Sequence, residues 1–399
     1  MLRARSNPAT RIGLAIIRAC FLFVRPVSLG HTGAGGDEIA NALCTCGRDE
    51  PPLPDPCGNP CDAHRAGNKG GQAVLNARVK TALKFCPNLP TPPGIAMRIV
   101  EMAREPNLDL GSLAQLLSQD PALASRVMRA SNSALFNRPH PTENLRQSIV
   151  VVGLDATMNL ALSFSLAQTL GKGLTSEQGV RLVWHRALIA SSGARLLGAR
   201  MNRRDQEELA LAALLQDIGI LALNAALPDE YPPILDGARD HDDLLRRERD
   251  SLGTDHGEAG VWLMQAWQLP KKLADAAGCA HGRCPDGLSA SDTTFHRIIA
   301  CSGRMANLIL GEDTEKLTTE LALSCLEVGH LSQDDLGSLL ESLAEVLPET
   351  ERLYETEVMS PALVTGILDQ AREILNTRNL MRDRTNRGRG LDGRSDRID

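Results

Sequence analysis

Apolar residues recur at helical spacing over most of the chain from about residue 73 onward. Ile95, Ile99 and Met102 fall at positions i, i+4 and i+7 after the Pro92-Pro93 pair, which is the spacing of one face of an α-helix. The spacing recurs in three further groups: Leu113, Leu116 and Leu117; Leu123, Val127 and Ala130; and Leu145, Ile149 and Val152. The pattern predicts a series of amphipathic helices.

Helix boundaries can be placed from residue chemistry. The Asp120 side chain can accept a hydrogen bond from a free amide of the first turn, and Pro121 fits the first helical position. A helix is therefore predicted to begin at Pro121. Gly153 follows the apolar run that ends at Val152, and we expect it to end that helix. The short run from Ile149 to Val152 also resembles a strand when it is considered alone.

The composition supports an all-α fold. Hydrophobic residues make up 43% of the chain but aromatic residues only 3%, so leucine and alanine supply most of the apolar surface. This favours helix packing over sandwiches or barrels. The net charge of −6 argues against a protein that coats nucleic acid, because such binding needs clustered lysine and arginine.

We predict four segments. Residues 1–72 form a leader rich in glycine, proline and cysteine, which we expect to be unstructured, and the sequence leaves open whether they belong to the mature protein. Residues 73–310 form the main helical domain, and residues 311–377 a helical extension. Residues 378–399 carry seven arginines against four aspartates and are expected to be a disordered basic tail. The apolar run 12–24 is too short to cross a bilayer.

Several motifs in a fixed order make residues 80–310 resemble the HDOD domain, a divergent relative of the HD and HD-GYP metal-dependent phosphohydrolases of bacterial signalling proteins. The resemblance implies an all-α, HDOD-type helical bundle. It rests on Leu89-Pro90, Ser118 to Leu123, Asn132 to Ala134, Ile149 to Leu154, Asn159-Leu160, Trp184-His185, Leu214 to Gly219, His256 to Gly260 and Trp267 to Pro270.

The same resemblance implies a degenerate hydrolase site. Catalytic HD enzymes hold a divalent metal with a histidine, an adjacent His-Asp pair and a later aspartate. His185 is assigned to the first position, Gln216-Asp217 to the pair and Gly303 to the last position. A carboxamide is a poor ligand in place of imidazole, and glycine offers none. Two remaining ligands fall short of the three that a catalytic metal usually has, so we expect no metal, no cofactor and no hydrolysis.

The remaining candidate residues have structural alternatives. Asp217 lies among leucines and is expected to bond a neighbouring amide, hydroxyl or His185. In catalytic relatives, extra histidines near His256 and His281 help to hold a second metal or substrate, so these two residues mark a ligand or partner cleft, as does Asn132. Structural roles are the favoured explanation, because a buried, hydrogen-bonded side chain accounts for each of the two histidines and a helix end accounts for Asn132.

The hypothesis is a non-catalytic, cytoplasmic HDOD module that binds a signalling protein or a small ligand. We expect no membrane association, little nucleic-acid binding, and a chain that could form a homo-oligomer. Two alternatives stay open: a residual metal-dependent phosphohydrolase acting on nucleotides or cyclic dinucleotides, and a regulator that contacts nucleic acid through the basic tail.

Overall fold

Helices form the regular structure of the part of the chain that the computed structural model describes, residues 75–391 without 107, 137–139, 171–175 and 330. These residues contain no strand, which confirms the all-α prediction. The leader, residues 1–72, lies outside the described residues. The helices are α2 (Ala77–Phe85), α3 (Gly94–Met102), α4 (Leu110–Leu117), α5 (Pro121–Ser131), α6 (Leu145–Val152), α7 (Leu154–Leu170), α8 (Glu177–Val180), α9 (Arg186–Arg200), α10 (Gln206–Leu215), α11 (Gly219–Ala226), α12 (Tyr231–Asp236), α13 (His241–Leu252), α14 (His256–Ala266), α15 (Lys271–Ala280), α16 (Ala290–Leu310), α17 (Thr314–Gly329), α18 (Gln333–Tyr354) and α19 (Pro361–Leu391).

Local chemistry sets the helix boundaries as the sequence predicts. The Asp120 carboxylate accepts a hydrogen bond of 3.0 Å from the Leu123 amide at the start of α5, with Pro121 in the first turn. Gly153 ends α6 with φ of 92°, a conformation that residues with a Cβ rarely adopt. The run from Ile149 to Val152 is therefore helical and not a strand.

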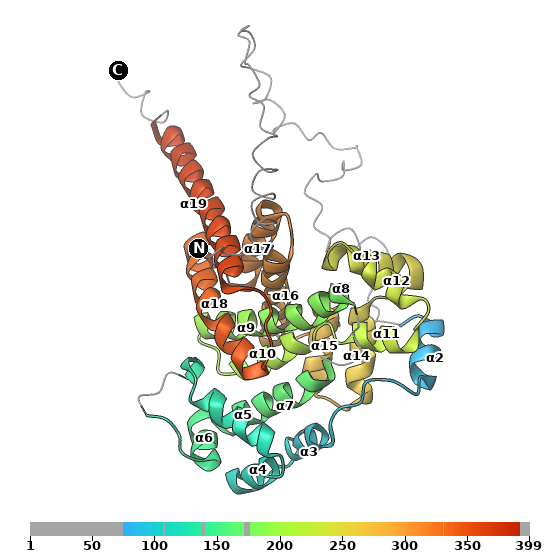
Figure 1. Cartoon of the computed structure of the whole chain (residues 1–399). Coiled ribbons are helices and arrows are strands. Elements are labelled where there is room, and N and C mark those ends of the chain that lie inside the picture. Colours follow the sequence, from blue (N-terminus) through green and yellow to red (C-terminus); the bar gives the residue numbers. More distant parts are fainter. Residues whose placement is uncertain (1–74, 107, 137–139, 171–175, 330, 392–399) are drawn as a thin grey trace, which may run out of the picture. The chain divides into compact units, whose positions relative to one another are not determined.

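The central helix of the bundle is α9, which packs against α10, α16 and α18. Helices α3 to α7 pack on one another and are joined to the rest through α7 against α10 and α5 against α18. Helices α11, α14, α15 and α16 follow as a chain of neighbours in which each packs on the next. Figure 1 shows α9 and α10 between the α3 to α7 group and α17 to α19.

The C-terminal extension packs on the bundle through α16 against α17 and α9 against α18. Helix α19 runs to Leu391, whereas the sequence predicts an unstructured tail from residue 378. Arginine and leucine are good helix formers, so residues 378–391 continue the helix that begins at Pro361. Residues 392–399 lie outside the described residues.

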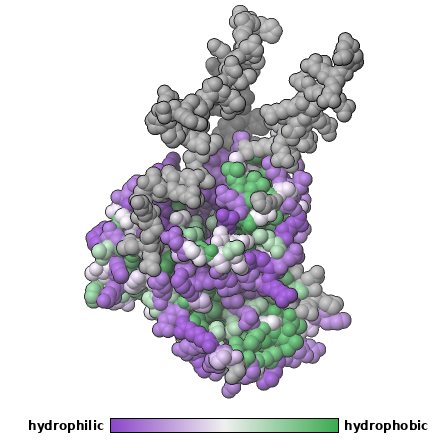
Figure 2. Space-filling view, turned by 180° about the vertical axis from the view of Figure 1, so that it is seen from behind, coloured by the Kyte–Doolittle hydropathy of each residue, from purple (hydrophilic) through white to green (hydrophobic). Residues whose placement is uncertain are grey.

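Burial explains the most apolar stretch of the chain. The segment Gln206–Ala226 is long and apolar enough to cross a membrane, judged by length and composition alone. However, 83% of its most apolar part is buried inside the protein. A second candidate, α6 with α7, is bent by 112°. The surface in Figure 2 is largely hydrophilic with separate apolar patches. The large apolar side chains that are exposed in the described residues are Phe85, Val150, Leu323, Leu326 and Leu363.

One close approach of two helices depends on glycine. A Cβ added at Gly219, the first residue of α11, would lie 1.8 Å from the carbonyl oxygen of His256 and 2.5 Å from the amide nitrogen of Gly260 in α14. Both are backbone atoms, so neither can rotate away. Gly219 therefore sets the distance between α11 and α14.

We expect Gly219→Ala to lower the free energy of unfolding by about 3 kcal/mol, because the two helices must separate. Urea unfolding followed by circular dichroism measures the loss. The matched control is Gly337→Ala in α18, where an added Cβ meets nothing within 4 Å. That change should raise stability by roughly 0.5–1 kcal/mol. Equal effects of the two substitutions would contradict the close-approach explanation.

Candidate functional site

A buried carboxylate, Asp217, lies in the turn between α10 and α11 and faces three histidines. Its Oδ1 atom is 3.2 Å from Nε2 of His241, 3.5 Å from Nε2 of His256 and 3.0 Å from Nε2 of His281. The exposed fractions of the four residues are between 0% and 6%. We call Asp217, His241, His256 and His281 the histidine–aspartate cluster.

The second oxygen of Asp217 forms an ion pair with a buried arginine. Nη1 of Arg186, the first residue of α9, donates to Oδ2 of Asp217. Burial alone would raise the pKa of Asp217, but the Arg186 guanidinium and His241 outweigh it and hold that pKa well below its ordinary value. The carboxylate is therefore ionised inside the bundle, with one oxygen toward Arg186 and the other toward the histidines.

Each histidine lies at the end of a helix. His241 is the first residue of α13 and His256 the first residue of α14, and each follows an aspartate that caps its helix. Asp240 accepts from the Asp243 amide at 2.7 Å, and Asp255 accepts from the Glu258 amide at 3.0 Å. His281 directly follows α15. The capped helix starts give these side chains fixed directions into the cluster.

Hydrogen bonds on the outer side of two histidine rings fix their orientation. Nδ1 of His256 lies 2.7 Å from Oε2 of Glu248, and Nδ1 of His281 lies 2.6 Å from the carbonyl oxygen of Ala277. Both partners are acceptors, so each Nδ1 carries the proton. Tyr231 donates to the other oxygen of Glu248 at 2.5 Å.

Electrostatics distinguish the two rings. Burial lowers the pKa of His281, and the neighbouring His256 lowers it further. Burial would also lower the pKa of His256, but the carboxylates of Glu248 and Asp217 outweigh it and raise that pKa to about 10. The two rings thus differ in protonation although both face the same carboxylate oxygen.

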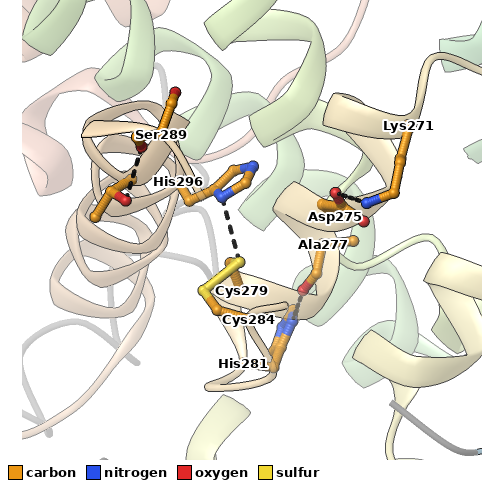
Figure 3. The surroundings of a disulfide bond; sticks show 9 residues. Lys271, Asp275, Ala277, Cys279, His281, Cys284, Ser289 and His296 are labelled. Carbon is orange, nitrogen blue, oxygen red and sulfur yellow. Dashed lines mark hydrogen bonds and ion pairs between the residues drawn. A yellow bond between two sulfur atoms is a disulfide. The ribbon is translucent and has the colours of Figure 1, made fainter. Parts of the chain in front are cut away.

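The turn that carries His281 is fixed from several sides. A disulfide joins Cys279 to Cys284 across this turn, and Nδ1 of His296 from α16 lies 3.3 Å from the Cys279 sulfur (Figure 3). Arg249 donates to the carbonyl oxygen of His281 at 2.9 Å and to the Asp255 carboxylate at 2.8 Å. Cys279, Cys284 and His296 form a second group whose ligand atoms lie close enough for a metal ion, but the two sulfurs could act as ligands only after reduction of the disulfide.

The structure brings together three of the four positions assigned to the degenerate site. Asp217 and Gln216 are adjacent in the chain, and Gly303 lies close to the Gln216 side chain and to Arg186, as the space around an added Cβ atom shows. This Cβ atom would lie 2.8 Å from Nη2 of Arg186 and 2.9 Å from Oε1 of Gln216. A carboxylate side chain at position 303 in α16 would therefore extend into the space that Arg186 and Gln216 occupy.

The structure does not pair His185 with Asp217. It is Arg186 that contacts Asp217, and His185 is not among the hydrogen-bonded partners of Asp217 in the described part of the chain. His185 is half-buried, with its pKa lowered by burial, and it ends a π-helical turn, Arg181–His185.

The residues at these positions do not fit a divalent metal. The Arg186 guanidinium is a cation and occupies the space between Asp217 and Gly303, and its Nε atom donates to Oδ1 of Asn307 at 3.2 Å. Oε1 of Gln216 has no hydrogen-bond partner among the described residues, and its amide donates to the Ala213 carbonyl. A metal here would meet a positive charge and lack an imidazole and a carboxylate.

Sequence reasoning missed Arg186, His241, Glu248 and Asn307. One signal was available: Asp240-His241 and Asp255-His256 are two Asp-His pairs, each with an acidic residue three positions after the aspartate, as at a capped helix start. This shared pattern could have indicated that His241 and His256 have equivalent positions, each at the start of a capped helix. No comparable local signal marks Arg186.

Asn132 lies away from the histidine–aspartate cluster. It ends α5, and its side-chain oxygen accepts from the Thr142 amide at 2.6 Å while its nitrogen donates to the Thr142 carbonyl at 3.1 Å. The residue fixes the chain between α5 and α6. It also lines a groove formed largely by α5 and α18, so Asn132 does not share a cleft with His256 and His281.

Comparison with known families identifies the domain that this helical bundle forms. Residues 89–282 match the family model of the HDOD domain, and the chain therefore contains an HDOD domain. A protein of Treponema pallidum (strain Nichols), described only as uncharacterized, is 23% identical over 199 residues, which cover 49% of this chain and 38% of that protein. The chain thus matches well under half of that relative's length.

Solved structures share the fold. An HDOD domain protein of unknown function from Geobacter sulfurreducens superposes with a TM-score of 0.57 at 21% identity, covering 69% of this chain and 98% of that chain. A protein from Shewanella amazonensis SB2B named as a candidate phosphohydrolase gives a TM-score of 0.53 at 21% identity, covering 70% and 98%.

We expect Arg186→Met to lower the free energy of unfolding by about 3–5 kcal/mol, because it leaves the Asp217 carboxylate buried without its guanidinium partner. Urea unfolding measures the loss, and adding Asp217→Asn should recover part of it. The control on the same helix is Arg200→Met. Arg200 pairs with Asp335 but is 49% exposed, so its loss should cost less than about 1 kcal/mol. Equal losses would contradict the role of the buried pair.

Proposed function

We propose that this chain is a non-catalytic, cytoplasmic signalling module of the HDOD type that binds a partner protein or a small ligand. The observation that carries the proposal is the Arg186–Asp217 ion pair. A fixed guanidinium fills the space that a metal would need beside Gln216 and Gly303. Hydrolysis of a phosphodiester by this class of site needs a metal to activate water.

Burial supports the same conclusion. A phosphate substrate would have to reach Asp217, which is 1% exposed, past His241, which is 4% exposed. The three histidines and Arg186 surround both carboxylate oxygens. A catalytic metal site needs an open position for water or substrate, and this arrangement leaves none on Asp217.

The groove beside Asn132 is the surface that we propose for partner or ligand binding. This open groove has a volume of about 940 Å³. It combines apolar side chains, such as Met128 and Leu353, with Arg129 and Arg352, which form ion pairs with Glu355 and Glu349. A lining of apolar side chains edged by paired charges suits the apolar face of an amphipathic segment. The lining residues are Ser118, Pro121, Ala124, Ser125, Met128, Arg129, Asn132, Ser133, Leu145, Glu349, Arg352 and Leu353.

The absence of catalysis is tested with the purified full chain and added Mn²⁺, on bis(p-nitrophenyl) phosphate, nucleotides and cyclic dinucleotides. We expect turnover no greater than that of the Asp217→Asn variant, because the residues around Asp217 leave no open position at which a metal could bind and activate water. Turnover by the wild-type chain that Asp217→Asn abolishes would contradict the proposal and favour a residual phosphohydrolase.

The groove is tested by introducing a charge at its floor. We expect Met128→Arg to reduce binding of a co-purifying protein or a thermal-shift ligand by at least about tenfold, without a change in Tm. The matched control is Leu323→Arg, at a side chain that is 58% exposed and is not in the groove. Binding that survives Met128→Arg, or that Leu323→Arg reduces equally, would exclude this surface.

A further inference from the structure

The four atoms that meet in the histidine–aspartate cluster have the spacing of a tetrahedral metal site. Nε2 of His256 lies 3.1 Å from Nε2 of His241 and 3.0 Å from Nε2 of His281. The distances from these nitrogens to Oδ1 of Asp217 are 3.0 to 3.5 Å, and all four atoms lie within 4.8 Å of one another. Ligands about 2.0 Å from Zn²⁺ at tetrahedral angles lie about 3.3 Å apart.

The hydrogen bonds at Nδ1 of His256 and His281 leave the Nε2 atoms of both rings as acceptors that face each other. Nδ1–H of His256 is donated to Glu248 and Nδ1–H of His281 to the Ala277 carbonyl. When both rings are neutral, as metal ligands must be, the Nε2 lone pairs therefore face each other and a carboxylate oxygen; without a metal ion, a second proton on His256 relieves the contact. A positive ion between them resolves this repulsion. A ring that donates its outer N–H to a carboxylate or a carbonyl is the usual partner arrangement of a zinc-bound histidine.

We propose that Asp217, His241, His256 and His281 bind one tetrahedral divalent cation of the Zn²⁺ class in a closed structural site. This inference goes beyond the proposed function and departs from the sequence-based expectation of no metal, which followed from the losses at Gln216 and Gly303 and favoured structural roles for His256 and His281. The ligand set is three imidazole nitrogens and one carboxylate oxygen, which suits Zn²⁺ better than Mg²⁺ or Ca²⁺.

The site would join four segments of the bundle: the turn before α11, the starts of α13 and α14, and the end of α15. Four protein ligands complete a tetrahedral shell, and their burial excludes a substrate, so the ion stabilises the fold and does not activate water. Arg186 holds the other Asp217 oxygen. The carboxylate thus bridges a fixed organic cation and an exchangeable metal ion.

The test is elemental analysis of the full chain, purified without a histidine tag, with its thermal unfolding before and after chelation. We expect about one Zn²⁺ per chain, and a Tm that falls by roughly 5–10 °C on chelation and returns on adding Zn²⁺. Titration of the metal-free chain with Co²⁺ should give the strong visible absorption of tetrahedral coordination without a sulfur charge-transfer band.

Variants separate this cluster from the Cys279, Cys284 and His296 group. His241→Gln and His281→Gln should lose the bound metal and its effect on Tm, whereas His296→Gln and Cys284→Ser should keep both. Metal lost in the latter pair alone, or a Co²⁺ spectrum with thiolate bands, would overturn the proposal. So would a wild-type chain that holds no metal and gains no stability from Zn²⁺. Metal content is read independently of phosphodiesterase activity, so the two proposals fail separately.

Discussion

The described bundle depends on the neutralisation of one buried charge. Asp217 is ionised and 1% exposed, and an isolated carboxylate in such a place costs several kcal/mol. Its neighbours come from α9, α13, α14 and the residue after α15, which are far apart in sequence. The chain must bring these elements together before the charge is compensated. The helices between residues 186 and 281 must therefore pack correctly for the charge of Asp217 to be neutralised.

Close backbone packing makes this convergence possible. Gly219 lets α11 approach α14, which places Asp217 beside His256. At Gly257 a Cβ would lie 2.8 Å from Nδ1 of His281, so a larger residue would displace that ring from α14. Arg249 ties the cap of α14 to the carbonyl of His281. The two glycines thus allow the helices to come close together, and Arg249 fixes the position of His281 relative to the start of α14.

The sequence predicts the helices well because their causes are local. Asp120, Pro121 and Gly153 act within one turn, and their roles can be derived from the chain alone. Gln216 and Gly303 were assigned through a family resemblance, and the structure places them side by side. Arg186 was missed because its partner lies 31 residues away, so no local pattern marks the contact. His241 was missed because contacts 24 and 15 residues distant, with Asp217 and His256, leave no periodic pattern.

The arginine beside Asp217 determines what this carboxylate can do. A metal ion at this place can be lost, replaced or opened to water, whereas a guanidinium attached to α9 is permanent and carries its charge at every physiological pH. Gly303 gives it space, and Asn307, one turn further along α16, accepts from its Nε atom. The pair thereby ties α9, the turn before α11 and α16 into a fixed arrangement. Such a constraint agrees with the proposed function, in which a partner binds at a surface and no substrate has to reach the buried Asp217.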